Sequence, residues 1–172
     1  MRQSRLVHLG LFMVSFAIDF FIQAIFNTTD LGPLTFVSQI HFLTLLLMTK
    51  EDDRFEITFK VILVCLVLDL MHLQTFPIFY VSYGIAAIII RIWYRHIGET
   101  MVELSLLMAL GLFVKEIVLY MMLIVTQSQS VPLNDFIIDR TIWVILGNLI
   151  FVPLAKWMYD YSSRIIGKIT YR

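Results

Sequence analysis

Charged residues are scarce in this sequence. Asp, Glu, Lys and Arg make up 15% of its 172 residues, whereas soluble domains contain about 25%. Hydrophobic residues reach 59%, and the mean hydropathy is +0.85. So little polar surface cannot cover a soluble globule. The composition therefore predicts an all-α integral membrane protein that forms a single transmembrane domain over residues 1–172.

Cysteine is limited to Cys65, which lies inside an apolar run. One thiol excludes an internal disulfide framework and a cysteine metal cluster. The formal net charge is zero, so nothing indicates a nucleic-acid partner. A nucleophile–base arrangement, a phosphate-binding glycine loop and a paired metal-ligand motif are also missing from the sequence. We therefore expect a protein that is not an enzyme and that has no cofactor and no metal site.

The apolar residues form about six runs that approach the ~20 residues a bilayer-spanning helix needs. The first run follows a basic start, but it is long for a signal peptide and no small-x-small cleavage site follows it, so we expect a retained span. The mixed-charge stretch 50–56 between the second and third runs predicts a solvated connector. The expected spans cover residues 6–26, 34–49, 57–73, 77–92, 101–125 and 136–158.

The basic residues predict how the chain is oriented. With the N-terminus in the cytoplasm, every Lys and Arg except Lys115 and Arg140 falls on the inner side of the membrane. Cytoplasmic loops carry an excess of Lys and Arg. We therefore expect a multi-pass protein with both termini in the cytoplasm.

Four charged residues lie somewhat past the middle of their predicted spans: Asp19, Asp69, Lys115 and Glu116. Such a residue costs a few kcal/mol at membrane depth, so by default it faces protein or water and marks a functional site. The spans that carry these four residues all run outward, which places them at similar depth in the outer half of the bilayer. Gln23 lies one helical turn from Asp19 and extends its polar face. These five residues are the predicted partner-binding or buried polar layer.

The partners within this layer are partly predictable. We expect Lys115 to pair with one carboxylate, and another carboxylate to be protonated or matched by a donor. Lys115 and Glu116 are adjacent and point about 100° apart on a helix, so we expect them to serve different faces, one of them toward another protein. The alternative for Asp69 is a carboxylate near the outer interface that simply reaches water.

Small and polar residues in the fourth and sixth spans predict helix packing. Gly84 and Ala87 lie in the fourth span, and Gly147 and Asn148 lie in the sixth, together with Pro153. Small residues allow neighbouring membrane helices to approach closely. We therefore expect Gly84, Ala87, Gly147 and Asn148 to be helix-packing residues.

Taken together, the length, the spans and the order of charges resemble those of the rod shape-determining protein MreD family of bacteria. The best local match is Val61–Ile92, VILVCLVLDLMHLQTFPIFYVSYGIAAIIIRI, which resembles that family's third and fourth spans. Asp69 and Gly84 match the family's aspartate and glycine positions, and Asp19 and Glu116 match positions where carboxylates are common. The chain departs from the family at Cys65 and Val61, where relatives often have glycine, and in the turn, which lacks a glycine.

The resemblance implies a non-enzymatic scaffold subunit of the cell-elongation complex in the bacterial inner membrane. Members of that family associate with the bitopic protein MreC and, with it, with the MreB filament and the peptidoglycan synthases. Their fold is similar to the substrate-binding subunits of energy-coupling-factor (ECF) vitamin transporters. A substrate-capture subunit of such a transporter is therefore the alternative function. A proton-coupled carrier that uses Asp69 or Glu116 as a relay is a third interpretation, although the sequence shows no internal repeat.

Overall fold

The computed structural model describes residues 2–28, 37–71, 77–94, 96, 100–126 and 132–170. Within these residues every regular element is a helix, which confirms the all-α class. The elements are α1 (Arg2–Thr28), α2 (Ile40–Met48), α3 (Arg54–Met71), α4 (Ile78–Trp93), α5 (Met101–Val125), α6 (Leu133–Phe136), the π-helical turn η2 (Ile137–Thr141), α7 (Ile142–Leu149) and α8 (Val152–Thr170).

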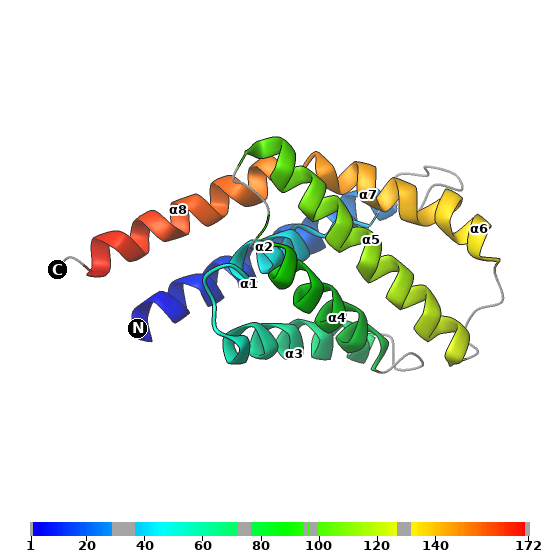
Figure 1. The fold of residues 1–172 in the computed structure, drawn as a ribbon, viewed down its shortest axis with the longest axis horizontal. Helices are drawn as coiled ribbons and strands as arrows, with labels where there is room; N and C mark the ends of the chain where they lie inside the picture. Colours follow the sequence, from blue (N-terminus) through cyan, green and yellow to red (C-terminus); the bar gives the residue numbers. More distant parts are fainter. Residues whose placement is uncertain are drawn as a thin grey trace.

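The short helix α2 lies at the centre of the bundle. All nine of its residues are buried, and it contacts α1, α3, α4, α5 and α8. Figure 1 shows both chain termini at the same end of the molecule, where α1 begins and α8 ends. Helix α4 lies between α3 and α5 and packs along both. The fold therefore wraps long helices around a nine-residue helix.

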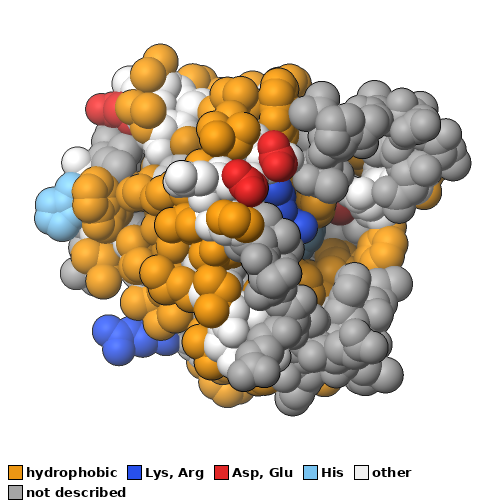
Figure 2. Space-filling view, turned by 90° about the vertical axis from the view of Figure 1, so that its right-hand side faces the viewer, with side chains coloured by type: hydrophobic (Ala, Val, Ile, Leu, Met, Phe, Trp, Pro, Cys, Tyr) orange, Lys and Arg blue, Asp and Glu red, His pale blue; other side chains and the backbone are white. Residues whose placement is uncertain are grey.

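Two helices are long and apolar enough to cross a membrane, over Leu6–Ile25 and Met101–Val125. A third crossing is added if Leu133–Leu149 and Val152–Lys168 form one span, although these two segments are bent by 48°. The outward faces of the long helices are apolar. Among the described residues, Figure 2 shows a largely hydrophobic surface at the end of the molecule opposite the termini. This surface is typical of a protein that contacts lipid.

Two predicted spans differ from the helices observed. Within the predicted span 34–49, whose residues 34–36 lie outside the described ranges, the helix has nine residues. Such a helix is about 14 Å long and cannot cross a hydrocarbon core of ~30 Å. The predicted span 136–158 is interrupted at residues 150–151. Pro153 lies just after this break, where it cannot donate a backbone hydrogen bond.

The other predicted spans agree with helices to within a few residues. α5 has the predicted bounds, 101–125. α3 and α4 begin and end close to the predictions of 57–73 and 77–92, with residues 72–73 outside the described ranges. α8 continues to Thr170 and carries a partly buried pair in which Lys156 Nζ donates to Asp160 Oδ2 over 3.2 Å. Neither α3, with 18 residues, nor α4, with 16, is among the helices that are both long and apolar enough for a full crossing.

Gly111 determines how closely α5 approaches its neighbours. A Cβ atom at this position would lie 2.5 Å from Leu46 Cδ1 of α2 and 3.1 Å from Ile90 Cγ1 of α4. Such distances are far below van der Waals contact, so only glycine fits without a shift of the packed side chains. Gly111 thus marks the crossing of α5 with α2 and α4, a role the sequence reasoning did not assign to it.

Candidate functional site

A carboxylate from α1 caps the start of α2. The backbone N–H groups of Ile40 and His41 donate to Asp19 over 2.8 and 2.6 Å, and the hydroxyl of Ser38 donates to the same carboxylate. Gln39, the residue at the N-cap of α2, makes no capping bond with its own side chain. The first N–H groups of a helix have no partner within it, and its N-terminus attracts negative charge. Asp19 supplies both the acceptors and the charge.

His41 extends this contact to α4. Its Nδ1 lies 2.5 Å from Asp19 Oδ2, and its Nε2 lies 2.8 Å from the hydroxyl oxygen of Tyr83. The two rings stack with an interplanar angle of 13°. With a neutral imidazole, Tyr83 donates to Nε2 and the Nδ1–H donates to Asp19. All three side chains are buried, so this chain of hydrogen bonds joins α1, α2 and α4 inside the protein.

Lys115 and Glu116 of α5 contact each other and α2. Lys115 Nζ lies 2.6 Å from Glu116 Oε1 and donates over 2.6 Å to Gln39 Oε1. Gln39 Nε2 donates to the same Glu116 oxygen over 3.2 Å, and Arg140 Nε donates to Oε2 over 3.1 Å. Lys115 also lies 5.7 Å from the ring centre of Tyr83, within the range of a cation–π contact.

This geometry corrects one prediction and specifies another. The adjacent Lys115 and Glu116 do not serve separate faces, because their long side chains reach around α5 and meet. Glu116 is the carboxylate that pairs with Lys115, and Arg140 of η2 provides a second cation. Glu116 is fully buried. The pair therefore points into the bundle and not toward another protein.

Asn148 and Gln23 complete the contacts of the segment that leads into α2. Asn148 Oδ1 accepts from the backbone N–H of Gln39 over 2.7 Å, and its Nδ2 donates to the carbonyl of Val37 over 2.8 Å. Gln23 Oε1 accepts from the backbone N–H of Ser38 over 3.2 Å. Side chains from α1 and α7 thus take the place of regular backbone pairing for residues 37–39.

We refer to these residues together as the α2 cluster. It comprises Asp19, Gln23, Ser38, Gln39, His41, Tyr83, Lys115, Glu116, Arg140 and Asn148.

Asp69 does not belong to the α2 cluster through any of these bonds. It accepts a hydrogen bond from the backbone N–H of Phe79 over 3.2 Å, at the first turn of α4. Pro77, at the N-cap of α4, offers no capping side chain. Asp69 is only 1% exposed, which contradicts the alternative that it simply reaches water. Like Asp19, it satisfies the start of the next helix.

The predicted packing residues have different surroundings. Asn148 and Ala87 are buried, and Gly147 of α7 is partly buried. The prediction for Gly84 is corrected, since a Cβ atom there would meet no atom within 4 Å. Gly84 does not allow a close approach of another described helix. It lines a cavity between α3 and α4.

A second buried ionic group lies in the connector between α2 and α3. Asp52 Oδ1 lies 2.9 Å from His8 Nδ1 of α1, and Lys60 Nζ of α3 donates to Asp52 Oδ2. Burial alone would raise the pKa of the Asp52 carboxyl, but hydrogen bonds from His8 and Lys60 and their charges hold this pKa below its usual value of 3.8. The predicted solvated connector is therefore wrong for Asp52, which is 4% exposed.

The α2 cluster is a buried network of hydrogen bonds and ion pairs that joins α2 to its neighbours. Buried polar groups are tolerated when they are hydrogen-bonded. Here Asp19 accepts from N–H and O–H groups of α2 and of the segment before it, and Glu116 accepts from Gln39, from Arg140 of η2 and from Lys115 of its own helix. Among the described residues, no group of three or more His, Cys, Asp or Glu could hold a metal ion. The arrangement therefore fixes α2 relative to α1, α4, α5 and α7.

The sequence predicted five members of the cluster, namely Asp19, Gln23, Lys115, Glu116 and Asn148. It did not predict the residues at the start of α2 that these five contact. Ser38, Gln39 and His41 were visible as polar residues in an apolar segment, but the segment was taken for a membrane span. Tyr83 gave no signal, and Arg140 was visible only as a basic residue outside the inner side. Their partners in the cluster lie 42 and 24 residues away along the chain.

Comparison with known proteins returns no match: no protein-family model, no curated protein and no solved structure corresponds to this chain.

Proposed function

We propose that this chain is a non-enzymatic membrane scaffold subunit of the bacterial elongation complex. In this role it binds the bitopic protein MreC and, with it, the MreB filament and the cell-wall synthases. It resides in the inner membrane as a multi-pass protein with cytoplasmic termini.

The observation that carries this proposal is the internal pairing of the α2 cluster. Asp19 accepts a hydrogen bond from the first turn of α2, Lys115 donates to Gln39 just before α2, and Lys115 and Glu116 form an ion pair. A capture subunit or a proton carrier would use such outer-half polar groups for a ligand or a relay. Here these polar groups are already bonded to α2 and to each other. This favours a rigid scaffold over a substrate-capture subunit and over a proton carrier. The resemblance of Val61–Ile92 to the MreD family supports the choice of partner.

The burial of the carboxylates changes how the partner is expected to bind. Asp69 and Glu116 are 1% and 0% exposed, so a transmembrane helix of MreC does not contact them directly. We expect it to pack on the apolar outer faces of the long helices, with the buried carboxylates holding these helices in position. Helix association in membranes relies on such van der Waals packing.

The test is purification of the full chain, tagged at its C-terminus, from native membranes in mild detergent, with mass spectrometry of the proteins recovered. Glu116→Gln is compared with Asp160→Asn, which removes a carboxylate charge on the exposed side of α8. Both variants are first checked for a single symmetric peak in gel filtration. We expect wild type and Asp160→Asn to retain MreC and cell-wall synthases, and Glu116→Gln to retain less of both.

Two outcomes would overturn the proposal. Recovery of ATPase subunits together with a bound small molecule would favour the substrate-capture alternative. Recovery of neither set of proteins by a wild-type chain that remains folded would also contradict a scaffold role.

A further inference from the structure

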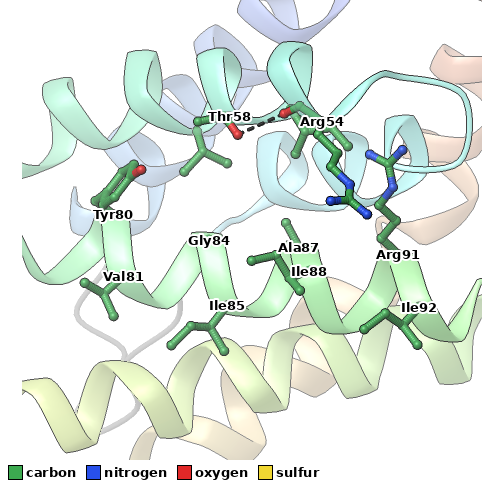
Figure 3. A pocket seen from close by; sticks show the side chains of 12 residues that line it. Arg54, Thr58, Tyr80, Val81, Gly84, Ile85, Ala87, Ile88, Arg91 and Ile92 are labelled. Atoms are coloured by element: carbon green, nitrogen blue, oxygen red, sulfur yellow. Dashed lines mark hydrogen bonds between the residues drawn. The ribbon is translucent and has the colours of Figure 1, made fainter.

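A cavity of about 580 Å³ lies between α3 and α4. Small or branched apolar residues line it, among them Val61 of α3 and Gly84 and Ala87 of α4. Figure 3 shows that Tyr80 lies toward one end of this cavity and that Arg54 and Arg91 lie together at the other. The cavity is therefore apolar along most of its length and cationic at one end.

The cationic end of the cavity is formed by the guanidinium groups of Arg54 and Arg91. Among the described residues, no carboxylate pairs with the guanidinium of Arg54 or of Arg91. Arg91 Nη1 is buried and has no hydrogen-bond partner. An unmatched buried donor costs free energy, and two neighbouring guanidinium groups favour an anion with several acceptor oxygens. A phosphate group meets this requirement.

Exposed apolar side chains border the apolar part of the cavity. Ile85 and Ile88 line the cavity and are 39% and 63% exposed. Phe59 and Ile62, on the neighbouring α3, are 48% and 45% exposed. Gly84 leaves the wall open, since a Cβ atom there would meet nothing within 4 Å. A hydrocarbon chain can therefore enter the cavity from the side of the membrane.

The length and position of the cavity match one leaflet. From Tyr80 to Arg91, α4 rises by about 17 Å at ~1.5 Å per residue, close to the ~15 Å that is half of a hydrocarbon core. Trp93, just beyond Arg91, is 51% exposed, as is typical of a residue at the membrane interface. An α4 that crosses one leaflet would thus hold the two arginines at the depth of the lipid headgroups.

We propose that this cavity binds one anionic phospholipid, with its phosphate on Arg54 and Arg91 and an acyl chain along Val61, Gly84 and Ala87. Basic pockets between membrane helices bind anionic headgroups in this way. A partner's transmembrane helix would fill the apolar length but would leave the two guanidinium groups unmatched. The lipid site goes beyond the proposed scaffold role and does not depend on it.

The test uses native mass spectrometry of the full chain in detergent with added phosphatidylglycerol or phosphatidylcholine. We expect one phosphatidylglycerol adduct to be retained in preference to phosphatidylcholine. Arg91→Gln and Arg54→Gln should each lower this preference by about tenfold, as for the loss of one charge-assisted hydrogen bond. Arg164→Gln, on the exposed face of α8, is the matched control and should retain the preference.

A second variant separates the acyl chain from the headgroup. Gly84→Leu fills the apolar length, so we expect it to lower the retention of both lipids while Arg54 and Arg91 remain. Inorganic phosphate at the same concentration should not displace the bound lipid, because it lacks the acyl chain. Equal retention of the two lipids by the wild type would overturn the proposal, as would displacement by phosphate or recovery of a bound polypeptide in place of lipid.

Discussion

At the scale of single residues, two aspartates occupy equivalent positions in successive helix pairs. Asp19 of α1 accepts from the first N–H groups of α2, and Asp69 of α3 accepts from an N–H in the first turn of α4. Neither α2 nor α4 has a capping side chain at its own N-cap. A carboxylate at a helix N-terminus is stabilised by the helix dipole and by hydrogen bonds. These contacts offset the cost of burying each charge away from water.

The pairing of Lys115 and Glu116 predicts non-additive effects of substitution. Glu116→Gln alone leaves Lys115 buried without its counter-charge, which should lower the free energy of unfolding by about 3–5 kcal/mol. Adding Lys115→Met to this variant should cost less than the sum of the two single changes, because it removes the uncompensated ammonium. Thermal unfolding of the four proteins in detergent measures this cycle. Strictly additive losses would show that the two side chains do not interact.

The lowered pKa of Asp52 predicts a loss of stability in acid. A carboxyl whose pKa is lower in the folded chain contributes its full stabilisation above the unfolded pKa, and the contribution disappears as the pH falls through the folded value. We therefore expect wild type to exceed Asp52→Asn in thermal stability at neutral pH, with the difference shrinking once the pH drops below 3.8. Melting curves across this range measure it. A difference that stays constant in acid would contradict the bonds from His8 and Lys60.

At the scale of helices, α2 depends on its neighbours. Nine residues are too few for a stable isolated helix, for which about 12–15 are already marginal in water. Tertiary contacts therefore supply its stability: Asp19 and Asn148 bind its start, and Leu46 packs against α5 at Gly111. A helix fixed at its start and along its side holds the helices around it at defined distances.

The close crossing at Gly111 predicts that one substitution has opposite effects at two helical glycines. Gly111→Leu forces atoms into Leu46 and Ile90, and overpacking of this kind costs about 1–3 kcal/mol or more. Gly84→Leu enters open space and gains helix propensity, so we expect its stability to equal or exceed that of wild type. Unfolding in detergent compares the two variants. A Gly111→Leu chain as stable as wild type would contradict the observed approach of α5.

At the scale of the whole molecule, the helical class and part of the polar site follow from the sequence, because they depend on local composition. Apolar runs predicted α1 and α3–α5, and the similar depths of Asp19, Lys115 and Glu116 predicted a polar layer. The short α2 was not predictable, since a buried apolar segment such as 40–48 has the same composition as a membrane span. The stacking of His41 on Tyr83 depends on how α2 and α4 pack, which no local pattern encodes.

The orientation of the molecule remains a prediction from its basic residues, and cysteine labelling can measure it. Cys65 is buried, so Cys65→Ala provides a background into which Glu51→Cys, Leu133→Cys or Arg164→Cys is introduced at an exposed position. The Lys and Arg distribution places residues 51 and 164 inside and residue 133 outside. In intact cells, a membrane-impermeant maleimide should therefore label only the Leu133→Cys chain, and permeabilised cells should show labelling of all three.

Labelling of residue 51 without residue 133 would mean the reverse orientation. Labelling of residue 51 but not residue 164 would place the connector and the C-terminal helix on opposite sides of the membrane and contradict the predicted number of crossings between them.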